Sequence, residues 1–225
     1  MIHRFGTLII ALTLVALAPL PLPAQRPSEL ADVCKVLGDA KPGQWASFDG
    51  TGSAGVGKLR LAVVGSEKSG DSTLYWFEVT FTGKDPGKSG VVQILTASLA
   101  SGLESPRALI FKVGPQPAMR LSGEMAGMMG KQGRQNASAF DWAGRCGGAH
   151  VVGWESVTVP AGTFRALHVT TEDGGELWAS RDVPFGVVKT HGKQGDMALT
   201  GRGADAKSSI SEKPLEMPGM AMPKD

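Results

Sequence analysis

Apolar and polar residues alternate along the first half of the chain in the way that β-strands require. Residues 58–64 alternate Leu59, Leu61 and Val63 with Lys58 and Arg60, and residues 73–82 place aromatic and aliphatic side chains at every second position. A period of two puts successive side chains on opposite faces of a sheet. Further strands are predicted at 44–48, 91–99 and 108–113, separated by turn clusters.

Residues 151–189 are the most regular part of this pattern, and they predict an antiparallel meander. Its strands are predicted at 151–159, 163–170 and 176–180, with a fourth beginning at 184–189. Pro160-Ala161-Gly162 and Gly174-Gly175 supply the turns between them, because proline presets φ and glycine accepts a left-handed conformation. The chain therefore predicts an open or closed antiparallel sheet.

A provisional register places Val159 opposite Thr163 and therefore Trp154 opposite His168. Both faces of this meander then hold large apolar groups, whereas a sheet with one wet face alternates more cleanly. We therefore expect the sheet to be covered on both sides, or to curl so that one face lines an interior.

Residues 114–139 break the strand pattern. Methionines and leucine recur there at helical spacing from Leu121, but the glycines at 123, 127, 130 and 133 weaken a helix by about 1 kcal/mol each. We predict an imperfect amphipathic helix or lid. After the meander, 196–200 is expected to pair with 187–191, a last strand is predicted at 207–211, and the Pro/Met-rich tail 212–225 is expected to be disordered.

The first 24 residues have the features of a signal peptide. A short basic segment with Arg4 precedes an apolar run at 8–18, and small residues end the segment before Gln25. A membrane anchor is the alternative, but the run is broken by proline and is shorter than the about 20 residues of a membrane span. We expect cleavage of residues 1–24 and a periplasmic or secreted protein.

The net charge of the chain bears on one class of function, nucleic-acid binding. The formal net charge of +2 falls to +1 when Arg4 is removed, because residues 1–24 contain no acidic residue and no other lysine or arginine. With no basic run, nucleic-acid binding is not expected. About 200 mature residues suffice for one domain with a core, which we place at 25–211.

Two cysteines can pair in an exported chain. Cys34 lies in a predicted helix, 28–37, and Cys146 lies in the glycine-rich approach to the meander. A disulfide between them would stabilise the fold by roughly 3–5 kcal/mol in the chain-entropy model. Two free buried thiols are the alternative.

No motif predicts a catalytic residue or a cofactor. Residues 50–58 (GTGSAGVGK) match part of a phosphate-binding loop, but Leu59 stands where serine or threonine would hold Mg²⁺ and a strand pattern follows. His150, His168 and His191 have no paired metal spacing. We therefore expect no enzyme activity.

The meander also resembles a known group. Residues 157–164 (VTVPAGTF), Leu177-Trp178 and 183–189 (VPFGVVK) are similar to a pattern in uncharacterised exported bacterial proteins that themselves resemble the periplasmic lipoprotein-carrier (LolA/LolB-like) superfamily. The resemblance implies a mainly β fold, an antiparallel incomplete barrel (half-barrel) around an apolar cavity, with one or two short helices covering the open side.

Resemblance and pattern together predict a non-catalytic protein that binds a hydrophobic small molecule, a lipid or the acyl chain of a lipoprotein. Apolar lining would supply affinity and a few polar groups would set orientation. The predicted ligand-binding residues are Trp76, Trp154, Phe164, His168 and Trp178 on the concave face, and Met125, Met128 and Met129 in the cover.

Two alternatives stay open. One is a structural or interaction module with a fully packed sheet and an envelope protein as partner. The other is Cu(I) binding, since thioether sulfur suits that ion. The methionines available for it are Met125, Met128 and Met129, and Met217, Met220 and Met222.

Overall fold

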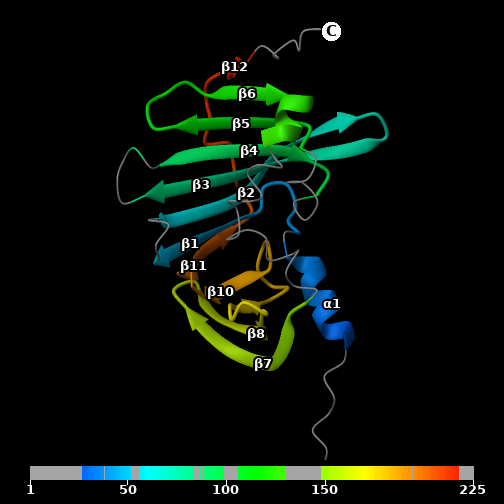
Figure 1. Ribbon diagram of the computed structural model, residues 1–225, viewed down its shortest axis with the longest axis vertical. Helices are drawn as coiled ribbons and strands as arrows, with labels where there is room; N and C mark the ends of the chain where they lie inside the picture. The colour runs from blue at the N-terminus through cyan, green and yellow to red at the C-terminus, as the bar shows by residue number, and fades with distance from the viewer. Residues whose placement is uncertain are drawn as a thin grey trace, which may run out of the picture.

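The computed structural model describes residues 27–37, 39–51, 56–83, 87, 89–98, 106–129, 148–193 and 195–217. They form one open twelve-stranded sheet that does not close into a barrel, with two short helices (Figure 1). The predicted mainly β, incomplete-barrel fold is therefore confirmed. None of the helices in these ranges is long and apolar enough to cross a bilayer. The predicted signal peptide, 1–24, lies outside the described residues.

Two antiparallel meanders build the sheet, and they meet where β1 pairs with β11. The first meander comprises β1 (Trp45–Thr51), β2 (Val56–Ser69), β3 (Ser72–Gly83), β4 (Gly90–Thr96), β5 (Ala108–Val113) and β6 (Met119–Ser122). The second comprises β7 (His150–Val159), β8 (Gly162–Thr170), β9 (Glu176–Ala179), β10 (Val187–His191) and β11 (Asp196–Gly203). A short parallel strand, β12 (Leu215–Glu216), pairs with β6.

The provisional register of the central hairpin was wrong by one residue. Val159 pairs with Gly162 and Trp154 pairs with Leu167, because only Pro160 and Ala161 separate β7 from β8. The predicted loop had three residues, and one residue fewer in the loop moves every cross-strand partner by one. Thr158 and Thr163 thus lie opposite each other, with hydroxyl oxygens 3.0 Å apart.

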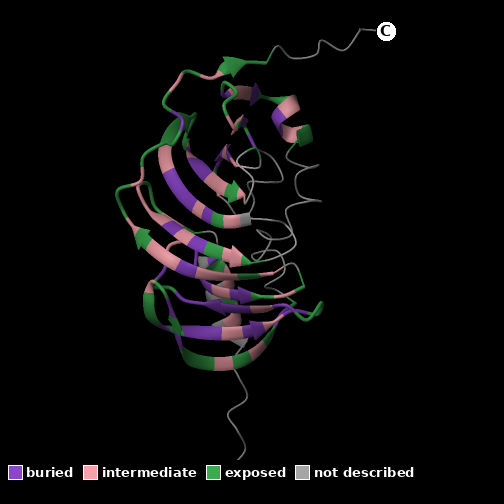
Figure 2. Cartoon of the chain, turned by 90° about the vertical axis from the view of Figure 1, so that its left-hand side faces the viewer, coloured by how far each residue is buried: buried purple, intermediate pink, exposed green. Residues whose placement is uncertain are grey.

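Both faces of the sheet are covered, which explains the apolar residues on both sides of β3. Tyr75 and Phe77 face the main core, which also receives Leu30 and Cys34 of α1 (Pro27–Val36). Trp76 faces the opposite way, into a second cluster. Figure 2 shows the curved sheet from its edge, with the strands bending around one side.

The second cluster lies under residues 204–217, which we call the strap. The strap leaves β11, crosses the outer face of the first meander and ends beside β6 as β12. Ile210 of the strap packs there with Leu74, Trp76 and Leu95. The strand predicted at 207–211 is therefore absent: these residues cross the strands of the sheet instead of pairing along one of them.

A buried carboxylate fastens the strap at its middle. The side chain of Glu78 on β3 is fully buried and accepts hydrogen bonds from the Ser209 amide (2.9 Å), the Ser209 hydroxyl (2.7 Å) and the Gln93 amide (2.8 Å). Arg60 lies 3.8 Å away. A buried charge is tolerated because these donors replace water.

The predicted tail, 212–225, begins inside this arrangement. Leu215 donates its amide hydrogen to Ala118 and Met217 donates to Arg120, so β12 covers part of the outer edge of β6. Pro214 precedes this short strand, and proline near a sheet edge disfavours further pairing. Residues 218–225 lie outside the described residues.

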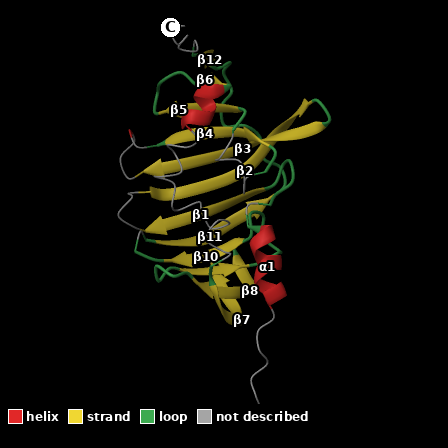
Figure 3. Ribbon diagram, turned by 45° about the vertical axis from the view of Figure 1, so that its right-hand side comes forward, coloured by secondary structure: helices red, strands yellow, loops and turns green. Residues whose placement is uncertain are grey.

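The predicted helix or lid at 114–139 forms only in part. Leu121 belongs to β6, not to a helix, and a helix occupies 124–129 (Figure 3). Gly123, with φ of 63°, makes the change from strand to helix, a conformation that glycine accepts readily. Ala126 of this helix packs on Ile94, Leu109 and Leu121 as a third cluster. Residues 130–147 lie outside the described residues.

Replacing Glu78 by alanine should lower the free energy of unfolding by about 3 kcal/mol, because the Ser209 and Gln93 donors lose their acceptor inside the protein. Urea unfolding of Glu78→Ala measures this loss. Ser209→Ala, which removes one hydroxyl donor, should cost about 1 kcal/mol. Equal stability of Glu78→Ala and the wild type would show that the strap does not depend on this carboxylate.

Two carboxylates of the strap make its attachment depend on pH. The Trp45 indole N–H donates to Asp205 and lowers the pKa of that carboxyl below its usual 3.8, and the Lys112 ammonium donates to Glu212 and lowers its pKa below 4.5. Folding therefore favours the ionised forms. Their stabilisation is complete above about pH 4.5 and is lost as the pH falls through the lowered values.

We predict that urea unfolding curves will show the free energy of unfolding falling as the pH is lowered below about 4.5, with a smaller fall in Glu212→Gln. Glu124→Gln is a matched control, because that exposed carboxylate lies on the helix 124–129. If the free energy of unfolding fell by the same amount in Glu212→Gln as in Glu124→Gln, the Glu212 carboxylate would not be a source of the pH dependence.

Candidate functional site

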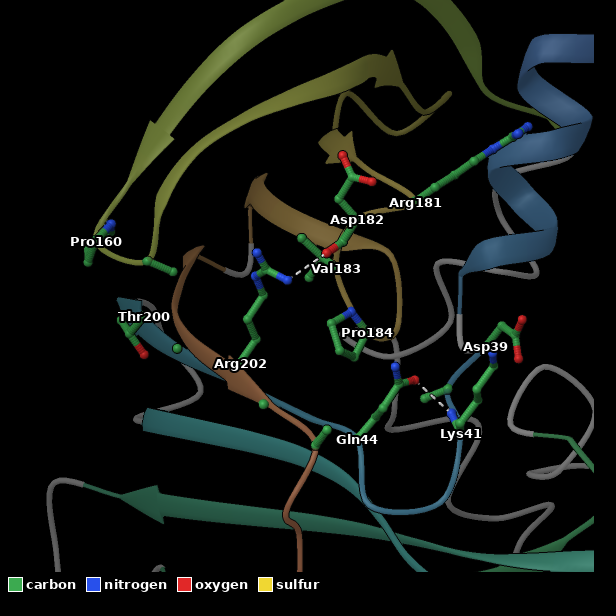
Figure 4. Close-up of a pocket in the computed structure, with 15 residues that line it drawn as sticks. Asp39, Lys41, Gln44, Pro160, Arg181, Asp182, Val183, Pro184, Thr200 and Arg202 are labelled. Carbon is green, nitrogen blue, oxygen red and sulfur yellow. Dashed lines mark hydrogen bonds between the residues drawn. The ribbon is translucent and has the colours of Figure 1, made fainter.

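The described residues enclose a pocket of ≈ 840 Å³ in the curled part of the sheet (Figure 4). A volume of this size suits a small organic molecule. Four segments that are far apart in the sequence form its walls. They are the 39–44 turn before β1, the β7–β8 hairpin tip, the loop after β9, and β11; the lining residues are Asp39, Ala40, Lys41, Gln44, Pro160, Ala161, Arg181, Asp182, Val183, Pro184, Thr200, Gly201, Arg202, Gly203 and Ala204.

The hairpin tip reaches the pocket because the second meander curls back on itself. The Ala161 amide donates a hydrogen bond of 3.1 Å to the Leu199 carbonyl of β11. This bond links the β7–β8 turn to a strand three places further along the sheet. Val157, Val159 and Phe164, which flank the turn, are buried in the main core, so apolar packing holds the tip over β11.

The loop after β9 forms the facing wall and is held from both ends. The Ser180 amide donates to Gly186 (2.8 Å), and the Phe185 amide donates to Asp39 (3.0 Å) in the turn before β1. Phe185 has φ of 65°, an unfavourable conformation for a bulky residue. Its side chain is 2% exposed, so core packing offsets the backbone strain that sets the position of this wall.

On β11, Gly201 and Gly203 lie against the ring of Trp45, which belongs to the neighbouring strand β1. A Cβ atom at Gly203 would lie 2.5 Å from the Trp45 Nε1 atom, and one at Gly201 would lie 3.3 Å from the same ring. Alternation along a strand then directs Arg202, the residue between them, to the other side. Arg202 and Thr200 are the β11 residues with polar side chains that line the pocket (Figure 4).

Arg202 is fixed within the pocket by two contacts. Its Nη1 donates to the Asp182 carbonyl oxygen (3.0 Å), and its guanidinium carbon lies 5.4 Å from the centre of the Phe164 ring. Arg181, which also lines the pocket, points toward α1 and pairs with Asp32 at 3.0 Å (Figure 4). The pocket therefore combines an oriented cation with the proline residues of the hairpin tip and the facing loop, Pro160 and Pro184.

The predicted ligand-binding residues are not brought together at one place. Phe164 and Trp178 belong to the main core, whereas Trp76 lies in the cluster under the strap. Met125 packs against the cluster of the helix 124–129, and Met128 and Met129 are exposed. Of the predicted set, Phe164 borders the pocket, through its contact with Arg202.

His168 and Trp178 do lie together, on neighbouring strands. Their rings stack with centroids 4.4 Å apart, and the Lys189 ammonium lies 4.7 Å from the Trp178 ring. The Trp178 indole N–H donates to Glu155, which also lies 3.1 Å from His168 Nδ1. The histidine Nε2 atom lies 3.4 Å from a Glu176 oxygen. Since side chains of neighbouring strands already pack on the indole ring and bond its N–H, this cluster resembles a structural contact between strands more than a ligand surface.

Three further predictions from the sequence are not tested by the residues that the structure describes. Trp154 is 39% exposed, and the Arg165 guanidinium carbon lies 5.0 Å from its ring centre; whether it meets a ligand stays a prediction. Cys146 lies outside the described residues, so its disulfide with Cys34 stays a prediction. Within the described ranges, no cluster of His, Cys, Asp and Glu could hold a metal ion, and Cu(I) binding by methionines is likewise untested.

The ligand-binding residues predicted from the sequence did not include four polar residues of this pocket: Arg202, Lys41, Gln44 and Asp182. These residues are polar and lie on short turns or at the end of a strand, with no motif around them. The one usable signal was the pair of proline turns in the meander: Pro160 and Pro184 lie on facing walls of the same pocket. The two segments 157–164 and 183–189, on which the resemblance rested, therefore both border this site.

No protein-family model and no curated protein matches the sequence. Several solved structures are similar to it, and two of them are described here. One is a proposed exported protein with a YmcC-like fold from Bacteroides fragilis NCTC 9343, with 12% identity, a TM-score of 0.37, and coverage of 75% of this chain and 99% of that chain. The other, a proposed lipoprotein from Parabacteroides distasonis ATCC 8503, has 13% identity, a TM-score of 0.34, and coverage of 72% and 96%. Likenesses at this level transfer neither fold nor function.

The strain at Phe185 can be measured with two truncations. Phe185→Ala and Phe185→Gly should each lower the free energy of unfolding by about 3 kcal/mol, because both remove a buried ring. Glycine tolerates the left-handed backbone, so Phe185→Gly should be about 1 kcal/mol more stable than Phe185→Ala. In most loops the alanine variant is the more stable one. Urea unfolding of Phe185→Ala and Phe185→Gly measures the difference in their free energies of unfolding. A more stable Phe185→Ala would rule out backbone strain at this position.

Proposed function

We propose that this is an exported, non-catalytic protein that binds a small amphipathic molecule, such as a lipid or an acyl compound, in the pocket beneath the β7–β8 hairpin tip. The observation that supports this most is the pocket itself: ≈ 840 Å³ with walls of mixed character. Pro160, Ala161 and Pro184 offer apolar surface, and Arg202 offers hydrogen-bond donors. Binding pockets commonly join apolar lining with a few oriented polar groups.

The position of the pocket also supports the proposal. The hairpin tip, the 181–184 loop and β11 are tied together by backbone hydrogen bonds and buried side chains, so the walls exist before a ligand arrives. A preformed site loses less conformational entropy on binding than one that must be ordered. The export part of the proposal rests on the predicted signal peptide, 1–24.

A second candidate function is docking to an envelope protein, which exposed apolar residues at the β5–β12 end of the sheet favour. Val113, Leu215 and Met217 are 45%, 54% and 37% exposed. Exposed apolar side chains that cluster can mark an interaction surface. This candidate gains weight only if the pocket binds nothing.

Native mass spectrometry of the mature protein, purified from its own envelope, tests the proposed function. We expect additional mass that organic solvent releases, in the range of a small lipid or acyl compound. Ala204→Trp should remove that mass because it places a bulky ring at the pocket wall. Lys193→Trp is the control, since Lys193 lies at the β10–β11 turn and does not line the pocket.

An unliganded mass for the wild type would contradict the proposal and favour the docking module. Ligand retained equally by Ala204→Trp and Lys193→Trp would place binding outside this pocket. Mass raised by a copper ion would favour the methionine alternative.

A further inference from the structure

We propose that the ligand carries an anionic group, a carboxylate or a phosphate, and that this group binds Arg202. The inference rests on the proposed function, because it names the chemistry of the molecule that occupies the same pocket. It begins from the environment of the Arg202 side chain and not from the overall charge of the protein.

The guanidinium of Arg202 is oriented before any ligand binds. Its Nη1 donates to the Asp182 carbonyl at 3.0 Å, and its plane is placed by the Phe164 ring, 5.4 Å from the guanidinium carbon. Arginine has five N–H donors in a planar fork, so most of them are still available. An oriented fork suits the two oxygens of a carboxylate or phosphate.

Its charge is not neutralised by a neighbour. Asp182 contacts Arg202 through a backbone carbonyl, and in the described part of the chain no carboxylate forms an ion pair with this guanidinium. Other arginines differ: Arg60, Arg120 and Arg181 lie 3.8, 3.6 and 3.0 Å from carboxylate oxygens of Glu78, Glu216 and Asp32. Arg202 is thus an exposed, oriented cation at the pocket, with no counter-ion among the residues that the structure describes.

The remaining lining fits an anion with an apolar part. Lys41 adds a second cation across the pocket, and the acidic side chains of the lining are Asp39 and Asp182. In Figure 4 the Asp182 carboxylate points away from the Arg202 guanidinium. The lining also includes Pro160 and Ala161, which present apolar surface. An anionic group at Arg202 would therefore leave a short hydrocarbon part against the hairpin tip.

Binding of four probes with similar chains tests this inference: octanoate, octyl phosphate, octyl phosphocholine and octyl maltoside. Amide ¹H–¹⁵N NMR of the mature protein gives the dissociation constant of each below its micelle concentration. We expect octanoate or octyl phosphate to bind at least about tenfold more tightly than octyl maltoside, a factor that corresponds to about 1.4 kcal/mol. Whichever of octanoate and octyl phosphate binds more tightly shows whether the pocket prefers a carboxylate or a phosphate. Octyl phosphocholine shows whether the phosphate of a lipid headgroup is accepted.

Arg202→Gln should abolish that tenfold preference of the anionic probes over octyl maltoside. Arg202→Lys, which keeps the charge but not the fork, should retain part of it. Arg165→Gln is the matched control, because Arg165 lies over Trp154 on the hairpin and does not line the pocket. The dispersion of the amide spectrum confirms in each variant that the fold is intact.

The outcomes separate this inference from the proposed function. Equal affinity for the anionic and neutral probes, or a preference that survives in Arg202→Gln, overturns the anionic ligand and leaves an amphiphile-binding pocket standing. Failure of all four probes to shift the resonances of the pocket residues overturns both.

Discussion

A single backbone hydrogen bond, from the Ala161 amide to the Leu199 carbonyl, marks the constraint on which the curled half of the molecule depends. It joins the tip of the β7–β8 hairpin to β11, although β9 and β10 lie between them in the sheet. Apolar packing of Val157, Val159 and Phe164 surrounds it. Because the tip is fixed over β11, the strands enclose space there instead of leaving an open face, and that space is the pocket.

The other half of the sheet solves a different problem. Its strands carry apolar side chains on both faces, so both need a cover. The helix 124–129 packs on one face, and the strap crosses the other with buried Glu78 fixing it at Ser209. A carboxylate specifies this position well, because any displacement of the strap would leave a buried charge without donors.

Local sequence signals predicted most strands and the open antiparallel fold, since alternation and proline–glycine turns depend on near neighbours. What they missed depends on contacts between distant residues. The hairpin register changed because the turn closes with two residues and not three. The segment 207–211 became a crossing strap because Glu78, 131 residues earlier, holds Ser209. No local pattern contains that pairing.

The candidate site was predicted even less completely. The aromatic residues chosen as a ligand surface proved to be divided between separate clusters, and Trp178 packs against His168 and Lys189. Arg202 went unnoticed because an arginine between two glycines has no signature until the curl of the sheet brings Asp182 and Phe164 to it. The proline turns at 160 and 184 were visible, but not that they face each other.

A crystal structure of the mature protein, purified from its own envelope without extraction of lipid, would show whether the pocket beneath the hairpin tip holds an anionic ligand. We expect density for an organic molecule between the hairpin tip, the 181–184 loop and Arg202, with an anionic group at the guanidinium. An empty pocket, or a ligand held instead by Trp76 or by the helix 124–129, would contradict it.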